Sequence, residues 1–184
     1  MMMKEISLHI LDIVENSVSA GAKLIEVDIT VERAQDMLSV TVKDNGCGMD
    51  EAMQQAVISP FTTSRTTRKV GLGIPFFKAG AEAAGGSFYL TSRVGEGTEI
   101  GATFKISNID RPPLGDMAET MLTLSLCNQD TDFILDYRVD NDKFLFDTRT
   151  IRETLGGIPF TTPEVMGWMR EYLIEGIQEL NGGV

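Results

Sequence analysis

The chain has 184 residues, of which 42% are hydrophobic and 23% are charged, so a packed globular core is expected rather than disorder. Its formal net charge of −11 argues against nucleic acid as a partner, because sequence-independent binding relies on Lys and Arg to neutralise phosphates. Two cysteines and one histidine form neither a disulfide framework nor a zinc-ligand pattern. The N-terminus lacks the apolar core of a secretory signal, and no apolar run approaches the ~20 residues of a membrane span. We therefore expect no membrane partner and a cytoplasmic location.

The first part of the chain shows helical and strand periodicities in turn. The predicted elements, in chain order, are helix 5–20, strands 25–31 and 38–42, helices 50–58 and 74–84, and strands 87–94 and 99–106. Residues 59–70 have no clear periodicity and are rich in Ser, Thr, Arg and Lys, which indicates a mobile loop. These elements predict one domain over residues 1–108.

A paired proline, Pro112-Pro113, interrupts the chain after these elements, because proline continues neither a strand ladder nor a helix. Beyond it, alternating apolar residues predict a hairpin formed by residues 133–139 and 144–146. Helices are predicted over residues 148–155 and 163–180. We therefore expect a small C-terminal hairpin-plus-helix domain, residues 114–184, of unknown role.

Two polar residues interrupt the apolar pattern of the first predicted helix. Asp12 and Asn16 are four residues apart, so both project from one face. An Asn amide oxygen is a hard ligand suited to Mg²⁺ beside ATP phosphates, and an Asp there could position or deprotonate a water molecule. Two solvated side chains on an exposed helix face would produce the same pattern, so this pair alone does not identify a site.

A glycine-containing motif, Asp44-Asn45-Gly46-Cys47-Gly48-Met49, directly follows the second predicted strand. A carboxylate at a strand end can accept a hydrogen bond from the exocyclic amino group of adenine, and glycines let the backbone approach the ring closely. This interpretation predicts an adenine-binding loop. An ordinary Asn-Gly turn would explain part of the motif equally well.

A second glycine motif, Gly71-Leu72-Gly73-Ile74, opens the predicted helix 74–84. Free N–H groups at the start of a helix, without a Cβ in the way, favour phosphate. The preceding segment carries Arg65, Arg68 and Lys69, and it could fold over the phosphates as a lid. A single Gly-x-Gly is a weak signal, and its value depends on its order among the other motifs.

In this order, the motifs resemble the ATPase superfamily of gyrase, histidine kinases, MutL and the ninety-kilodalton chaperones. Residues 11–17 followed by Ala20-Gly21-Ala22 are similar to the Asn-bearing box of MutL, and residues 44–49 are similar to the adenine-binding box. Ser59-Pro60-Phe61-Thr62-Thr63, residues 71–74 and Gly95-Glu96-Gly97-Thr98 are similar to the later boxes of histidine kinases. The resemblance covers residues 8–106.

This resemblance implies an α+β fold, a two-layer α/β sandwich of the Bergerat type in which helices cover one face of a mixed sheet, here with a small C-terminal α+β appendage. It implies ATP and Mg²⁺ as ligands, with Asn16 binding the magnesium ion and Asp12 in the position of the catalytic residue. The residues expected to contact the nucleotide are Asn16, Ala20, Asp44, Gly46, Gly48, Met49, Phe61, Thr62, Arg65, Lys69, Gly71, Leu72, Gly73, Ile74 and Thr98.

Two departures from the superfamily affect the expected activity. Hydrolysing members usually have Glu where this chain has Asp12, which is one methylene shorter, so its role as a base stays open. Histidine kinases carry a phosphoacceptor domain upstream, whereas few residues precede the first helix here. We therefore expect a stand-alone protein kinase acting on a partner protein, similar to the anti-sigma-factor serine kinases. An ATP-hydrolysing switch that regulates a partner and a non-enzymatic ATP-binding regulator are the alternatives, and a homodimer is possible.

Overall fold

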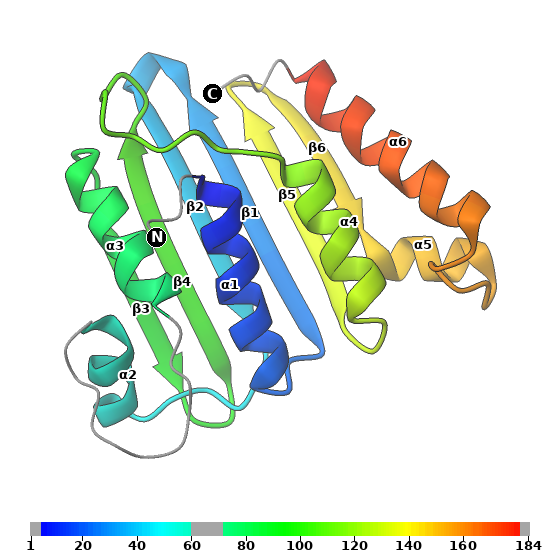
Figure 1. Ribbon diagram of the computed structural model, residues 1–184, viewed down its shortest axis with the longest axis horizontal. Helices are drawn as coiled ribbons and strands as arrows, with labels where there is room; N and C mark the ends of the chain where they lie inside the picture. Colours follow the sequence, from blue (N-terminus) through cyan, green and yellow to red (C-terminus); the bar gives the residue numbers. More distant parts are fainter. Residues whose placement is uncertain (1–4, 60–71, 181–184) are drawn as a thin grey trace.

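A computed structural model of the protein describes residues 5–59 and 72–180. The elements in chain order (Figure 1) are α1 (Ile6–Ser19), β1 (Leu24–Glu32), the 3-10 turn η1 (Arg33–Gln35), β2 (Met37–Asp44), α2 (Glu51–Ile58), α3 (Gly73–Ala83), β3 (Phe88–Arg93), β4 (Gly97–Lys105), α4 (Met117–Cys127), β5 (Asp132–Val139), β6 (Asp142–Asp147), α5 (Thr148–Leu155) and α6 (Pro163–Glu179). Within these ranges, no helix is long and apolar enough to cross a membrane.

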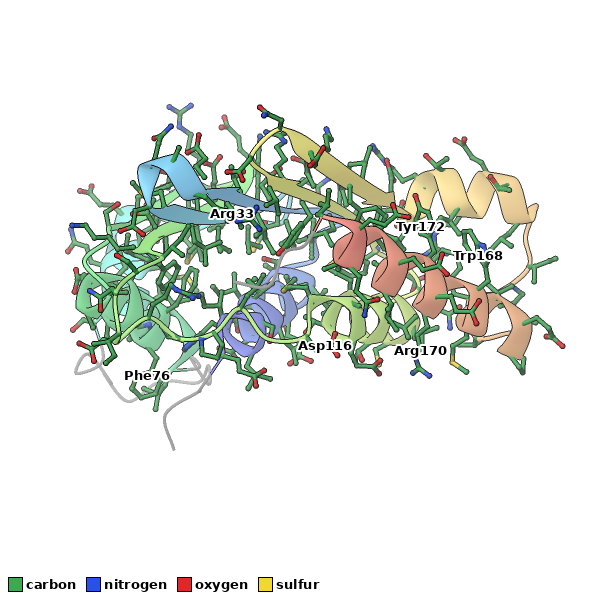
Figure 2. The ribbon with its side chains drawn as sticks, turned by 90° about the horizontal axis from the view of Figure 1, so that it is seen from above. Arg33, Phe76, Asp116, Trp168, Arg170 and Tyr172 are labelled. Carbon is green, nitrogen blue, oxygen red and sulfur yellow. The ribbon has the colours of Figure 1, made fainter. Side chains whose placement is uncertain are left out.

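The six strands form one mixed sheet in the order β3-β4-β2-β1-β5-β6. Neighbouring strands are antiparallel except β1 and β5, which pair in parallel. Seen from above in Figure 2, α1, α3, α4 and α6 lie on one side of the sheet. The predicted two-layer α/β sandwich is therefore confirmed.

The core lies between the sheet and this helix layer. Every second residue of β1 is fully buried because successive side chains of a strand point to opposite faces. The apolar stripe of α1, which includes Ile6, Ile10 and Ile13, packs onto this face. Each fully buried Ile contributes about 1.5–3 kcal/mol to folding. This packing fixes the rotation of α1 about its axis, and thereby the direction of its polar residues.

The C-terminal hairpin extends the same sheet. Residue by residue, Leu24–Val31 of β1 pair with Asp132–Val139 of β5, and β6 forms the outer edge. The parallel pairing needs a crossover, and α4 provides it by packing against α1 and β5. The division of the chain at residues 108 and 114 stays a prediction, although the hydrogen-bonded sheet continues across it.

Helix α4 is absent from the sequence-based prediction. Its exposed residues, Glu119, Thr123 and Cys127, are four apart and form one face, but the buried residues include Thr120 and Ser125, so polarity does not separate the two faces. Asp116 begins the helix by accepting a hydrogen bond from the Glu119 amide.

The Pro-Pro segment also differs from a free linker. The carbonyl oxygens of Pro113 and Leu114 accept hydrogen bonds of 2.9 and 2.8 Å from the amides of Ile6 and Ser7. These amides belong to the first turn of α1 and have no partner inside the helix. The segment therefore anchors the start of the helix that carries Asp12 and Asn16.

Candidate nucleotide-binding site

A cavity of about 230 Å³ lies where α1, α2 and α3 meet the ends of β2 and β4. Its wall is mainly apolar, with polar groups from α1 and the two strands. The lining residues are Ile13, Asn16, Ser17, Ser19, Ala20, Asp44, Cys47, Gly48, Met49, Met53, Val57, Ile74, Thr98 and Ile100. Segments far apart in the sequence thus form one site.

Asp44 is the buried acid of this cavity, with only 8% of its surface exposed. The Ser17 hydroxyl donates a 2.6 Å hydrogen bond to Oδ2, and the Gly46 amide donates a 2.8 Å hydrogen bond to Oδ1. A carboxylate has about four acceptor positions, so two donors leave capacity for a ligand. Its orientation is fixed before any ligand arrives, which makes Asp44 a preorganised acceptor.

Asn45 holds the loop to the rest of the sheet. Its side-chain oxygen accepts hydrogen bonds of 2.8 and 2.9 Å from the amides of Lys23 and of Leu24, the first residue of β1. An ordinary Asn-Gly turn does not by itself account for these two hydrogen bonds. Instead, the loop leaves β2 and crosses toward the start of β1.

Gly48 allows the loop to touch the turn between β3 and β4. Its φ is +67°, and a Cβ at this position would lie 1.9 Å from the carbonyl oxygen of Arg93. Any side chain would force the loop and the turn apart. Beside it, the Met49 amide donates a 2.8 Å hydrogen bond to the Ser92 hydroxyl.

Ser92 connects this loop to Thr98. Its hydroxyl lies 2.8 Å from Oγ1 of Thr98 and 2.9 Å from the Gly97 carbonyl oxygen. Thr98 pairs with Asp44 across β2 and β4, so both reach the same end of the cavity. Sequence reasoning identified neither Ser17 nor Ser92 as a site residue. The one feature of the sequence that could have indicated Ser17 as a site residue is its position directly after Asn16.

Asp12 lies beside the cavity, against the start of α3. A Cβ at Gly73 would be 1.7 Å from Oδ2 of Asp12, so the glycine is what allows the carboxylate to lie there. Oδ2 is buried and has no hydrogen-bond partner among the described residues. A buried carboxylate oxygen without a donor is costly, and it accepts readily from a ligand or water that reaches it.

His9 lies one turn before Asp12, with 3% of its surface exposed and its ring 5.7 Å from that of Phe77. Burial lowers the pKa of His9 below its usual 6.5, whereas a backbone hydrogen bond with Gly73 and the charge of Asp12 oppose this shift. Its Nδ1 has no partner in the part of the chain that the structure describes. Burial therefore favours the neutral form of the His9 imidazole beside Asp12.

The structure brings most of the predicted contact residues together. Those lining the cavity are Asn16, Ala20, Asp44, Gly48, Met49, Ile74 and Thr98. Gly46 supports Asp44, Gly73 adjoins Asp12, and the exposed Leu72 caps α3 without lining the cavity. Phe61, Thr62, Arg65, Lys69 and Gly71 lie outside the described residues.

The fold is a two-layer α/β sandwich, and its cavity combines an apolar wall with the buried carboxylate of Asp44. Residues 4–108 match the protein-family model described as histidine kinase-, DNA gyrase B- and HSP90-like ATPase, which is more than half of the chain. The chain belongs to this family.

Curated relatives include a putative sensor protein of Shewanella frigidimarina (strain NCIMB 400), 33% identical over 96 residues. Sensor histidine kinase YvrG of Bacillus subtilis (strain 168) is 31% identical over 94 residues. These matches cover 52% and 49% of this chain but only 14% and 16% of the relatives. The chain therefore spans a small part of the length of these proteins, and the similarity lies in the shared domain.

Two solved structures have the same fold. The ATPase domain of Aquifex aeolicus MutL in complex with ADP superposes with a TM-score of 0.53 at 18% identity, covering 84% of this chain and 70% of that one. The N-terminal domain of a DNA repair protein gives 0.51 at 15% identity, covering 78% and 52%. At these identities the likeness establishes the fold alone.

Proposed function

We propose that this protein binds ATP with Mg²⁺ and transfers the terminal phosphoryl group to a partner protein. The observation that carries the proposal is the buried carboxylate of Asp44, which Ser17 and Gly46 hold in place beside an apolar cavity. Family membership and the sensor-kinase relatives support a phosphoryl-transfer reaction.

The cavity fits an adenine ring. The ring has flat apolar faces and a hydrogen-bonding edge, so a suitable site combines apolar walls with one oriented acceptor. Ile13, Ile74 and Ile100 supply apolar wall, and Asp44 supplies an acceptor for the exocyclic amino group. Thr98 adds a hydroxyl at the same end of the cavity.

Asn16 and the start of α3 fit the polar half of the nucleotide. Asn16 is exposed at the wall of the cavity, and its amide oxygen would hold a magnesium ion. When bound, this ion supplies charge neutralisation on the phosphates. The first amides of α3, near Gly73 and Ile74, would bind phosphate oxygens, because amides at a helix start lack intrahelical partners.

The position of Asp12 favours transfer over hydrolysis. Its carboxylate lies against Gly73, and its short side chain keeps one oxygen buried there. Phosphoryl transfer depends mainly on positioning and charge neutralisation, so Asp12 can orient an attacking hydroxyl of the partner without a strong water-activating base.

The second candidate function is an ATPase switch that changes partner binding. The observation that favours it is that Oδ2 of Asp12, beside the cavity, has no hydrogen-bond partner among the described residues, because a general base needs a lone pair that no other donor occupies. In this alternative, Asp12→Asn stops the release of phosphate.

ATP labelled at the γ-phosphate distinguishes these functions. The purified protein is incubated with labelled ATP and Mg²⁺, with and without a cell extract. Label on another protein, lost in Asp44→Asn, supports the kinase. Free phosphate without labelled protein supports the ATPase and contradicts the kinase. If neither free phosphate nor labelled protein forms, the result supports a non-enzymatic ATP-binding regulator.

A further inference from the structure

A second hollow of about 400 Å³ lies between β6, α5 and α6. Its apolar lining includes Leu145 of β6, Ile151 and Leu155 of α5, and Trp168 and Tyr172 of α6. We call this hollow the α5–α6 groove. Figure 1 shows these elements at the sheet edge opposite α2, a helix that contributes Met53 and Val57 to the first cavity. The groove is therefore separate from the site described above.

Two stacked aromatic side chains dominate one wall of the groove. The rings of Trp168 and Tyr172 are 5.4 Å apart and inclined by 10° (Figure 2). Tyr172 is fixed from inside by Phe144, 5.2 Å away, and its hydroxyl donates a 3.3 Å hydrogen bond to the Leu145 carbonyl oxygen. The aromatic wall is thus held in place before any partner binds, which lowers the entropy cost of binding.

These side chains remain substantially exposed. Trp168, Tyr172 and Leu145 have exposed fractions of 47%, 38% and 46%. Enclosed small-molecule sites cover about 70–90% of their ligand, whereas the side chains of this groove lie at the surface. Exposed Trp and Tyr in a hollow are typical of protein-binding hot spots. The groove therefore fits an apolar side chain presented by a macromolecule.

The rim of the groove on α6 is acidic. Glu164 is four residues before Trp168, Glu171 is three after it, and Glu175 is three after Tyr172. Residues at these spacings lie on the same side of a helix. All three glutamates are exposed, and none forms an ion pair within the described residues.

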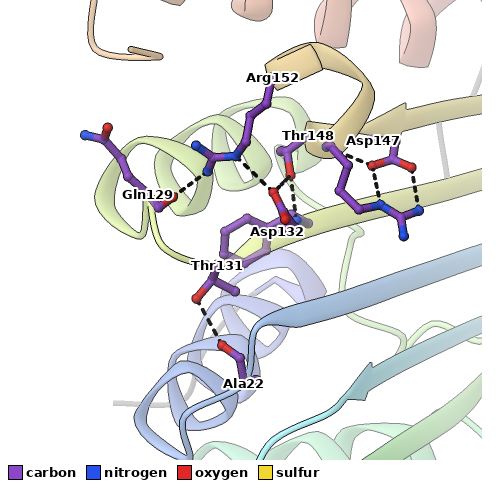
Figure 3. A network of polar contacts seen from close by, with 9 residues as sticks. Ala22, Gln129, Thr131, Asp132, Asp147, Thr148 and Arg152 are labelled. Atoms are coloured by element: carbon purple, nitrogen blue, oxygen red, sulfur yellow. Dashed lines mark hydrogen bonds and ion pairs between the residues drawn. The ribbon is translucent and has the colours of Figure 1, made fainter. Parts of the chain in front are cut away.

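The nearby arginines do not offset this charge, because each already pairs with a carboxylate. Arg149 donates to Asp147, and Arg152 donates to Asp132 and to the Gln129 carbonyl oxygen (Figure 3). Arg170 faces Glu119 of α4, at 3.4 Å. The rim therefore keeps an excess of negative charge, consistent with the net charge of −11.

We propose that the α5–α6 groove docks a basic segment of a partner protein. The segment inserts an apolar side chain beside Trp168 and places Lys or Arg opposite Glu164, Glu171 and Glu175. A second copy of this chain is the poorer occupant, because a symmetric contact would bring the same glutamates together. The docking site deepens the proposed function by naming where a protein substrate is held, and it depends on no step of ATP chemistry.

Trp168 is the single tryptophan of the chain, so its fluorescence reports on this groove alone. The probes are two synthetic amphipathic peptides, one of Leu and Lys and one of Leu and Glu, added to the full protein without nucleotide. We expect a saturable blue shift of the emission with the Leu/Lys peptide and no shift with the Leu/Glu peptide. An equal response to both peptides, or no response, overturns the proposal.

Variants measured by calorimetry locate the binding. We expect Trp168→Ala to weaken Leu/Lys peptide binding at least tenfold, and Glu171→Gln with Glu175→Gln to weaken it severalfold and reduce its salt dependence. Ile109→Ala, which truncates a side chain that is 97% exposed outside the groove, is the matched control and keeps wild-type affinity. Unchanged affinity in Trp168→Ala contradicts the proposal.

Two further measurements separate the outcomes. Asp44→Asn should keep peptide binding, because the groove does not depend on ATP binding. If the wild-type protein binds the peptide but labels no other protein with γ-phosphate, the proposed kinase activity is contradicted and the docking site stands. A dimer seen by sedimentation that Trp168→Ala dissociates would overturn the proposal in favour of a second copy.

Discussion

Ser17 and Asp44 are 27 residues apart in sequence, and the Ser17 hydroxyl donates a 2.6 Å hydrogen bond to Oδ2 of Asp44. Ser17 belongs to the helix layer and Asp44 to the sheet, so this contact joins the two layers at the cavity. The other carboxylate oxygen of Asp44, Oδ1, accepts a hydrogen bond from the Gly46 amide.

Removing this hydroxyl should weaken ATP binding. In Ser17→Ala, Asp44 loses a buried donor worth about 1–2 kcal/mol and is no longer held in one orientation. We expect about tenfold weaker ATP binding by calorimetry. Ser125→Ala is the matched control, because Ser125 is a buried helix serine outside the cavity lining, whose hydroxyl donates to the Met121 carbonyl oxygen of its own helix. Equal affinities of the two variants would refute the role of Ser17.

Asp44→Asn should abolish measurable ATP binding. The side-chain NH₂ of the new Asn is a donor where the adenine amino group needs an acceptor. The remaining side-chain oxygen is neutral, so it accepts the hydrogen bond from the Gly46 backbone amide more weakly than the carboxylate does. Asp116→Asn controls for loss of charge, since Asn caps the start of α4 as well as Asp does. Unchanged ATP affinity of Asp44→Asn would refute the assignment of the cavity.

Asn16→Ala should remove the magnesium dependence of ATP binding. Wild-type protein is expected to bind ATP more tightly with Mg²⁺ than with a chelator, and the variant should bind equally under both conditions, because the proposed amide ligand is gone. Glu15→Ala, the exposed neighbour on α1, serves as control. Persistent magnesium dependence in Asn16→Ala would count against the assignment.

Gly73→Ala should impair phosphoryl transfer. The added methyl group would lie 1.7 Å from Oδ2 of Asp12, so either the carboxylate or the start of α3 must move. We expect loss of γ-phosphate transfer and a lower unfolding midpoint in urea. Gly167→Ala in α6 meets nothing within 4 Å and should stabilise the helix by about 0.5–1 kcal/mol. Wild-type transfer by Gly73→Ala would show that this contact is dispensable.

His9 should make stability depend on pH. Burial lowers its pKa in the folded state below 6.5, so the unfolded chain binds the proton more tightly. The stabilisation is complete well above pH 6.5 and is lost as the pH falls through 6.5 toward the lowered pKa, by up to about 1.4 kcal/mol per pH unit.

Urea unfolding at pH 7.5, 6.5 and 5.5 measures this effect. His9→Gln should show a shallower loss of stability over this range than the wild type, because it removes the only imidazole of the chain. Parallel curves for the two proteins would exclude His9 as the source.

Local patterns in the sequence were enough to predict most elements, whereas the two-layer fold followed from the resemblance to the ATPase superfamily. The alternation of β1 and β2 and the helical spacing of α1 depend only on neighbours within a few residues, so they can be recognised without the tertiary structure. The same holds for Asp44 and its glycines, where the residue types and their order indicated a nucleotide site.

Tertiary structure alone decided how distant parts meet. The parallel pairing of β5 with β1, the packing of α4 against α1 and β5, and the contact of Ser17 with Asp44 all join segments with no local signal. The α5–α6 groove is of the same kind, because the exposure of Trp168 depends on how α6 lies against β6. Periodicity shows which face of an element is apolar, but the packing partner determines what that face covers and what it leaves open.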